Sequence, residues 1–214
     1  NEPAPSGIAD SIIANATEAD GLYNYDTDTE TPGYRYSGAT PNNYITFNEE
    51  TWRIIGFVDG SQIGKEAGTY YTKIIRNESL GTKEWDSNGQ NTWSASSLYS
   101  TLNSTAAYIN NANVESVDWH HTSQDSSSVK TTAMYTNEGW GTTCSASSKN
   151  CTHNAKVGLM SPSDYGYASS SCYSSTNLSS YNSDTCKNSN WLFLGSTEWL
   201  LAPMAIADHI SWSV

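Results

Sequence analysis

The four cysteines carry the plainest chemistry in this chain of 214 residues, and they lie in a stretch rich in Ser and Asn. Cys144 and Cys151 are seven positions apart, and Cys172 and Cys186 are fourteen apart. Four cysteines allow three pairings, and short loops favour the sequential one, Cys144 with Cys151 and Cys172 with Cys186. A zinc site would need Cys-x2-4-Cys spacing, which these separations do not give. The pattern therefore predicts disulfides and an oxidising, extracytoplasmic compartment.

Two other stretches hold side chains of types that bind metals. Asp26-Thr-Asp28-Thr-Glu30 resembles the start of a calcium loop, but the Gly after the third ligand and the distal Glu are missing, which favours a solvated acidic loop. His120 and His121 are adjacent, so on a strand they point to opposite faces, and no third ligand stands at a recognisable spacing. We expect exposed or capping histidines, no metal and no cofactor.

No catalytic motif is present. The chain has no Gly-x-Ser-x-Gly nucleophile elbow and no His-Glu-x-x-His. Two carboxylates for glycoside hydrolysis can converge from anywhere in a chain, so the sequence leaves that alternative open. We expect a protein that is not an enzyme.

Charge and composition exclude two classes of partner. A net charge of −12 would repel nucleic acid instead of releasing counterions from it. No apolar run approaches the roughly 18 residues of a membrane span, and no signal peptide is present. Eight Trp and fourteen Tyr supply large apolar areas for the core of one domain. The remaining composition suits a secreted sugar binder and an inert filament subunit equally well.

The element that must position the rest runs from Tyr44 to Val58 and is interpreted as a strand, a turn and a second strand. Within Trp52 to Val58 both faces are largely apolar at a period of two, which is typical of a strand inside a sheet. Tyr70 to Arg76 repeats the pattern after a loop and predicts a third, antiparallel strand. We expect this meander to be the core of the fold.

The other elements follow from local patterns. In chain order we expect a linker or tail at 1–7, a helix over Ile8–Ala19, a loop over Gly21–Pro41, a helix from Ser94 with Ala95, Leu98 and Leu102 on one face, one helical turn or an irregular segment over Lys130–Glu138, a strand over Lys156–Met160, a helix start at Ser161–Asp164, and strands over Trp191–Leu194, Trp199–Pro203 and Ile210–Val214.

Several stretches together resemble one family. They are 14–23, 41–47, 51–56, 74–79 and 157–167. These stretches are similar to bacterial extracellular domains of uncharacterised function that are common in Gram-positive gut bacteria and occur on large surface proteins or behind pilin-like helices. The resemblance runs from about residue 8 to the end, and the family supplies no catalytic residue.

Three of its features also resemble the C-type-lectin-like fold shared with the formylglycine-generating-enzyme group. They are the Trp-Arg-Ile strand at Trp52, the helix over Ser97–Asn103 and the late strand at Trp199. The resemblance implies an α+β fold, with a small twisted antiparallel β-core, two or three short helices and long disulfide-stapled loops, in a single domain over 8–214.

Two functions are compatible with this family. The first is a structural subunit of a pilus or other cell-surface filament, whose partners are further subunits. The alternative is a surface adhesin, a module that binds a glycan or protein. Its contacts would be Trp85, Trp93 and Trp140, since aromatic faces stack on sugar rings, although the same residues suit core or loop anchors equally well.

The last strand, Ile210–Val214, is followed in the resembled family by a turn and further strands that pair beside the N-terminal part of the sheet. Without them we expect an unpaired edge beside Trp52 and Ile54, which invites pairing with another chain. Either the chain is part of a longer protein, or a neighbouring subunit supplies the missing strands.

Overall fold

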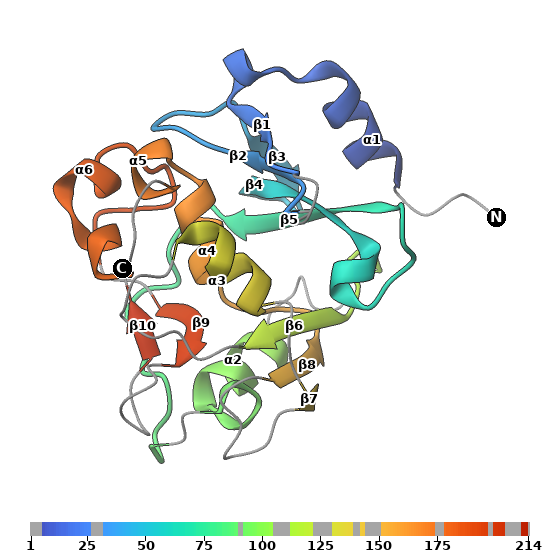
Figure 1. Cartoon of the computed structure of the whole chain (residues 1–214). Coiled ribbons are helices and arrows are strands. Elements are labelled where there is room, and N and C mark those ends of the chain that lie inside the picture. The colour runs from blue at the N-terminus through green and yellow to red at the C-terminus, as the bar shows by residue number, and fades with distance from the viewer. Residues whose placement is uncertain are drawn as a thin grey trace.

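The strand β4 (Glu50–Asp59) is the centre of the main sheet (Figure 1). The structure is a computed structural model that describes residues 6–26, 32–89, 92–104, 112–121, 130–138, 142–143, 151–173, 178–196, 199–203 and 211–213. One edge of β4 pairs antiparallel with β5 (Tyr70–Arg76), and the opposite edge pairs with β3 (Tyr44–Phe47) and then with β2 (Tyr34–Tyr36). β1 (Leu22–Asn24) pairs with β2 on its outer side. The expected meander of β3, β4 and β5 is confirmed.

Local sequence explains the shape of this sheet. Asn48 and Glu49 join β3 to β4 with φ angles of 50° and 64°, as a tight two-residue hairpin turn requires. Every residue from Trp52 to Val58 is buried, as expected for a strand with two apolar faces. The register with β5 shifts between Ile54 and Gly56, which places Gly56 opposite Lys73.

The remaining elements surround the main sheet. The helices are α1 (Ser6–Asn15), α2 (Ser97–Ser104), α3 (Thr131–Glu138), α4 (Pro162–Tyr167), α5 (Ser170–Tyr173) and α6 (Asp184–Lys187), and short 3-10 turns lie at Glu18–Asp20, Gly60–Ile63, Trp93–Ala95 and Leu178–Asn182. A second sheet joins β6 (Val117–His121), β8 (Cys151–Ala155) and β7 (Thr142–Thr143), and a third joins β9 (Trp199–Pro203) to β10 (Ser211–Ser213). The fold is thus α+β with mainly antiparallel pairing.

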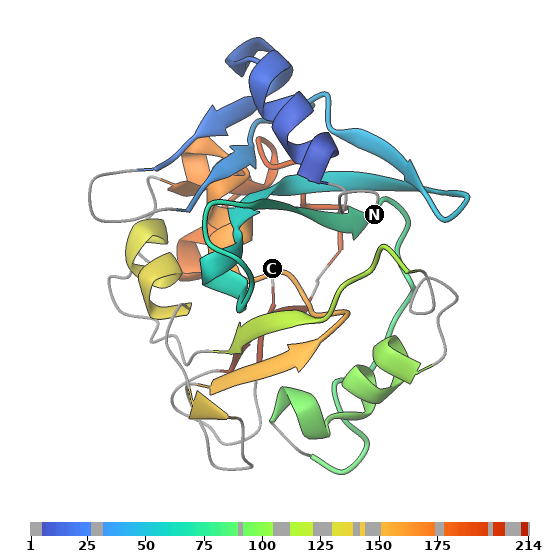
Figure 2. The same ribbon diagram turned by 90° about the vertical axis from the view of Figure 1, so that its right-hand side faces the viewer.

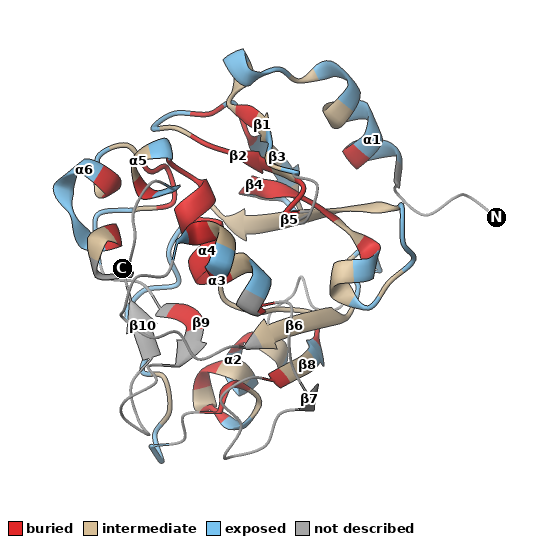
Figure 3. Cartoon of the chain, viewed as in Figure 1, coloured by how far each residue is buried: buried red, intermediate tan, exposed pale blue. Residues whose placement is uncertain are grey.

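Two apolar clusters hold these elements together. The main cluster joins the large sheet to α1 and to α3 to α6, and includes Ala9, Phe57, Met134, Tyr165 and Leu200. The second cluster contains Trp93, Leu98, Leu102 and Leu201 and lies under α2. Figure 2 shows α1 on one side of the main sheet and the sheet of β6 and β8 on the other. Figure 3 shows the buried residues concentrated in β4 and α4.

Several elements differ from expectation at their ends. α1 begins at Ser6, inside the predicted linker, and ends at Asn15 instead of Ala19. The predicted loop over 21–41 contains β1 and β2, whose three residues each are too few to show a periodicity. The segment Lys130–Glu138 holds α3, a helix of eight residues, where a single turn or an irregular segment was expected.

Two predicted strands are wrong because side chains take their backbone hydrogen bonds. In the strand expected over Lys156–Met160, Asn103 bonds both the N–H and the C=O of Val157, and the actual strand, β8, ends at Ala155. In the strand expected over Trp191–Leu194, the N–H of Leu192 donates to the side chain of Asn190 at 3.0 Å. Such local bonds replace the ladder that a strand needs.

The strand expected at the C-terminal end is present as β10, which pairs with β9. The unpaired edge expected beside Trp52 and Ile54 is not found. Trp52 pairs with Ile45 on one side and with Arg76 on the other, so this part of β4 lies inside the sheet.

Candidate functional site: a half-buried lysine and two buried carboxyl groups

Three ionisable side chains from different elements meet beside the main cluster. Lys73 comes from β5, Glu138 is the last residue of α3, and Asp164 lies in the first turn of α4. Asp164 and Glu138 are buried, with 2% and 6% of their surface exposed. Burying a charged group costs free energy unless the group is paired. Buried ionisable side chains therefore mark a candidate functional site.

Asp164 is fixed by the start of its own helix. Ser161 is the N-cap of α4 and Pro162 follows it, and a capping box joins Ser161 to Asp164, as the sequence predicts. The Ser161 N–H donates to Asp164 Oδ2 at 2.8 Å. The carboxyl group therefore has one orientation, turned back toward the N-terminus of the helix.

Lys73 reaches the same oxygen from the sheet. Its Nζ lies 2.6 Å from Asp164 Oδ2 and 5.2 Å from the centroid of the Trp119 ring. The Trp119 indole is held in turn by a bond from its Nε1 to the carbonyl of Ala155 at 2.9 Å. The side chain of Lys73 is 19% exposed, against 2% for its partner. The ion pair is thus shielded on most sides.

Glu138 lies against the same turn of α4. Ser163, the neighbour of Asp164 in the chain, donates to it twice, from its N–H to Oε1 at 3.0 Å and from its hydroxyl to Oε2. Burial is the main reason that the pKa of Glu138 is raised to about 8; the charge of Asp164 also raises this pKa, whereas the Ser163 bonds and the charge of Lys73 lower it. Glu138 is therefore a neutral acid at pH 7 that can give and take a proton.

Sequence reasoning missed this cluster. Lys73 and Asp164 are 91 positions apart, and no motif spacing links either of them to Glu138. The start signal at Ser161–Asp164 predicts a helix and no chemistry, and Glu138 lies in a segment expected to be one helical turn or irregular. Only the fold brings the three together.

A second candidate is a shallow surface depression beside the first half of β4 and the end of β5. Its lining residues are Arg53, Ile75, Arg76, Asn77, Trp191, Leu192 and Leu194. The guanidinium of Arg53 stacks between the rings of Tyr44 and Trp191, at 4.5 and 4.4 Å from their centroids, and donates twice to Asn43 Oδ1. Burial lowers the pKa of Arg53. Tyr44 is 59% exposed, so this stack reaches the surface.

Of the three tryptophans predicted as possible ligand contacts, the structure describes Trp85 and Trp93. Trp93 is fully buried in the second cluster, where Trp85 packs against it with ring centroids 5.6 Å apart. A side chain without exposed surface does not contact a ligand, so Trp93 is a core anchor. Trp140 lies outside the described residues.

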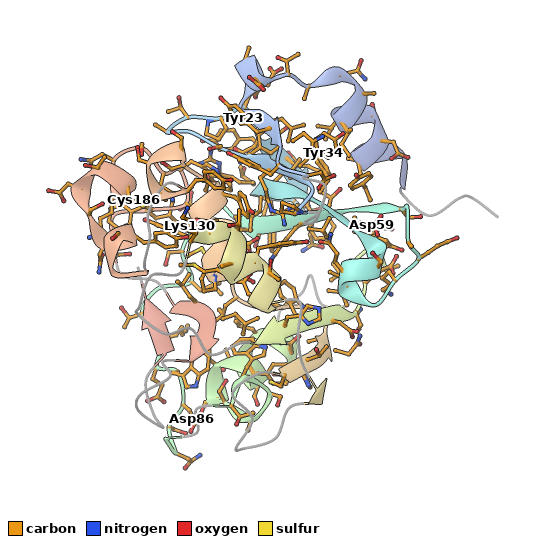
Figure 4. All side chains as sticks on the ribbon, viewed as in Figure 1. Tyr23, Tyr34, Asp59, Asp86, Lys130 and Cys186 are labelled. Carbon is orange, nitrogen blue, oxygen red and sulfur yellow. A yellow bond between two sulfur atoms is a disulfide. The ribbon has the colours of Figure 1, made fainter. Side chains whose placement is uncertain are left out.

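The cysteines are disulfide-bonded as far as the structure describes them. Cys172 and Cys186 form the predicted bond, which joins α5 to α6 with the two Cα atoms 4.8 Å apart; Cys186 is labelled in Figure 4. Both are buried in the main cluster. Cys151 is buried and also disulfide-bonded, and its expected partner Cys144 lies outside the described residues.

Of the candidate metal ligands, the structure describes the side chains of Asp26 and His120. His120 uses one ring nitrogen toward Thr152 Oγ1 at 3.1 Å and the other toward the carbonyl of Gln62 at 2.8 Å. Asp26 accepts from the N–H of Gly33 at 2.6 Å, while 27–31 lie outside the described residues. Within the described part of the chain, no three His, Cys, Asp or Glu side chains are grouped to hold a metal. Nor does any helix described there have the length and apolar character to cross a membrane.

Comparison with protein-family models, with curated proteins and with solved structures found no match to this chain.

Proposed function

We propose that this chain is a non-enzymatic, extracellular structural domain with a C-type-lectin-like fold, and that it is a subunit of a pilus or other cell-surface filament. The observation that carries the proposal is the edge strand β3. It lies at one end of the sheet order and pairs with β4 alone among the described strands. Tyr44 and Thr46 on this strand are exposed.

The sequence of β3 lacks the features that protect edges. Soluble proteins discourage pairing at an exposed edge with Lys, other charges, Pro or a bulge. β3 reads Tyr-Ile-Thr-Phe and has none of the residue types in that set. An extended segment from a neighbouring subunit could add to this edge through main-chain hydrogen bonds.

The disulfide between Cys172 and Cys186 supports an extracellular place for this assembly. α5 and α6 have four residues each, which is too short for a helix to be stable alone. The bond ties them together and persists only where thiols are oxidised. The disulfide thus holds these short helices in one arrangement outside the cell. A fixed surface of this kind is what a filament subunit needs for its contacts.

Electron microscopy with an antibody to the purified protein, on intact cells and on sheared surface material, tests the proposal. We expect labelled filaments, and the Thr46→Lys variant should lose them because it puts a charge on the edge strand. Thr51→Lys is the matched control, since Thr51 is also exposed and lies opposite Thr46, but on a strand paired on both sides. Labelled surface without filaments, or equal behaviour of the two variants, would contradict the proposal.

The exposed stack at Tyr44 favours a second function, that of a surface adhesin. A sugar ring could pack on the free face of Tyr44 beside the shallow surface depression, and Arg76 could bond its hydroxyls. Glycan-array binding should then be lost in Tyr44→Ala and kept in Tyr173→Ala, an exposed tyrosine on α5. Binding to no glycan, or equal loss in both variants, would rule this function out.

A further inference from the structure

We propose that Tyr25 and Tyr173 are a site of oxidative cross-linking, at which hydrogen peroxide and a haem peroxidase join the two phenol rings into dityrosine. Tyr25 directly follows β1, and Tyr173 is the last residue of α5. The new bond ties the end of β1 to the helix that also carries Cys172. The reaction requires neither the filament function nor the adhesin function.

Three tyrosine rings meet at this place. The ring centroid of Tyr167, at the end of α4, lies 4.7 Å from that of Tyr25 and 5.5 Å from that of Tyr173. The centroids of Tyr25 and Tyr173 are also 5.5 Å apart, and their planes are tilted by 40°. Aromatic rings in direct contact have centroids about 4.5 to 7 Å apart, so each of the three rings touches the other two.

Exposure decides which two of the three rings react. Tyr173 is 36% exposed and Tyr25 is half-buried, whereas Tyr167 and its hydroxyl oxygen are buried. Tyrosine has an ordinary pKa of about 10, and burial raises the pKa of Tyr25, so both reacting phenols carry a proton at neutral pH. Each must release that proton to water when it loses an electron. Tyr167 has no water beside its hydroxyl, so it holds the other two rings in place and keeps its own phenol.

The reaction begins at the exposed ring. The oxidant takes one electron from Tyr173, the phenol proton passes to water, and a phenoxyl radical remains. Tyr25 then gives an electron to this radical across the ring contact and a proton to water, and Tyr173 regains a proton. A second oxidation of Tyr173 leaves one radical on each of the two rings.

Coupling of the two radicals completes the balance. The unpaired electrons are shared with the ring carbons next to the phenol oxygens, and there they pair to form one C–C bond. Each joined carbon releases its hydrogen as a proton while its phenol oxygen takes one up, which restores both aromatic rings. Together the two tyrosines lose two electrons and two protons, and one hydrogen peroxide takes them and becomes two waters. Two C–H bonds and the O–O bond of the peroxide are broken.

The disulfide next to this site indicates an environment in which such oxidation occurs. Cys172 precedes Tyr173 in the chain, and its bond with Cys186 persists only where thiols are oxidised. With the dityrosine in place, one covalent bond joins the end of β1 to α5 and another joins α5 to α6. Three short segments that are distant in the chain then hold one another.

The test treats the purified protein, at low concentration, with hydrogen peroxide and a haem peroxidase, and then measures its intact mass after full reduction of disulfides. We expect the mass to fall by about 2 Da, which is two hydrogens, and the blue fluorescence of dityrosine to appear. In a tryptic digest the peptides 1–35 and 157–187 should form one joined species, linked at Tyr25 and Tyr173. An unchanged mass, or a link that joins only separate molecules, would overturn the proposal.

Replacement of single tyrosines by Phe keeps each ring and removes only its hydroxyl. Tyr25→Phe and Tyr173→Phe should each abolish the link, with far-ultraviolet circular dichroism reporting that they fold. Tyr167→Phe should retain the link, because its ring still supports the other two. Tyr23→Phe should also retain it, although the Tyr23 ring lies only 6.2 Å from that of Tyr25. A link that persists in Tyr173→Phe, or is lost in Tyr167→Phe, would refute the assignment.

The chain contains a second tyrosine pair as a control. The rings of Tyr165 and Tyr181 are also in contact, with centroids 5.7 Å apart and planes tilted by 38°, but both residues are fully buried. Oxidant and water do not reach their phenols in the folded chain, so we expect this pair to stay unlinked. Tyr181→Phe should therefore still lose about 2 Da on oxidation. A link between Tyr165 and Tyr181 would show that ring contact alone suffices and would overturn the role given to exposure.

Discussion

The neutral acid at Glu138 makes a quantitative prediction about stability and pH. The folded chain holds this carboxyl group with a pKa of about 8 against an ordinary value of 4.5, chiefly because it is buried. Between these two pH values the unfolded chain has lost the proton and the folded chain keeps it. The unfolded state therefore binds fewer protons, and the free energy of unfolding falls as pH rises through this window.

The size of the effect follows from the two pKa values. Each pH unit between them corresponds to about 1.4 kcal/mol, so the full window from 4.5 to 8 corresponds to at most about 5 kcal/mol. Below the window both states are protonated, and above it both are ionised, so the slope from Glu138 vanishes at either end. The loss is a large fraction of the stability of a typical domain.

Urea unfolding of wild type and Glu138→Gln at pH 5, 7 and 9 measures this fall in the free energy of unfolding. Gln does not ionise, so the stability of the variant relative to wild type should rise steadily with pH across the series. A constant difference in stability between the two proteins leaves this trend intact. Glu115→Gln, on a half-exposed side chain, is the matched control and should show little trend. A difference between wild type and Glu138→Gln that stays flat from pH 5 to 9 would refute the reasoning.

Three further predictions concern packing. Replacing Cys172 and Cys186 by Ala should cost about 3 kcal/mol in urea unfolding, because their bond closes a loop of about 15 residues, and iodoacetamide should label neither thiol in the native wild type; a cost below about 1 kcal/mol contradicts this. Arg53→Met should cost about 3 kcal/mol by the same assay, since it leaves a buried amide oxygen without its donor, and unchanged stability would count against it. Gly166→Ala should lower the melting temperature, since its Cβ would overlap two packed hydroxyl groups at a cost of about 2 kcal/mol, while Gly7→Ala, in open space, should not; equal effects would show that the space at Gly166 relaxes.

The sequence predicts those parts of the fold that are stabilised by their own residues. β3, β4 and β5 carry long apolar patterns, and α4 carries its Ser, Pro and Asp start signal, so their types are readable from neighbouring residues. β1 and β2 have three residues each and depend on distant partners, because β2 pairs with β4 and β1 pairs with β2. The stretch at Val157 looks like a strand, but the backbone N–H and C=O of Val157 bond the side chain of the distant Asn103.

The candidate site could not be predicted from the sequence, because its side chains are brought together by contacts between distant residues. The pairing of Lys73 with Asp164 depends on how β5 and α4 pack, and packing across 91 positions leaves no local trace. The burial of Glu138 depends on α3, which has weak amphipathic character and was expected to be irregular. The Cys172–Cys186 bond could be predicted because its partners are close in the chain and both are of one reactive type.

The composition of the main cluster determines when the chain can fold. Ala9 and Leu22 pack in the same cluster as Trp191 and Leu200, and the cluster is incomplete without either end. At 5 to 20 residues per second, a ribosome finishes Leu200 about 10 to 40 seconds after Ala9. Contacts between such distant residues also form slowly. The core is therefore completed only after residues from both ends of the cluster have been synthesised.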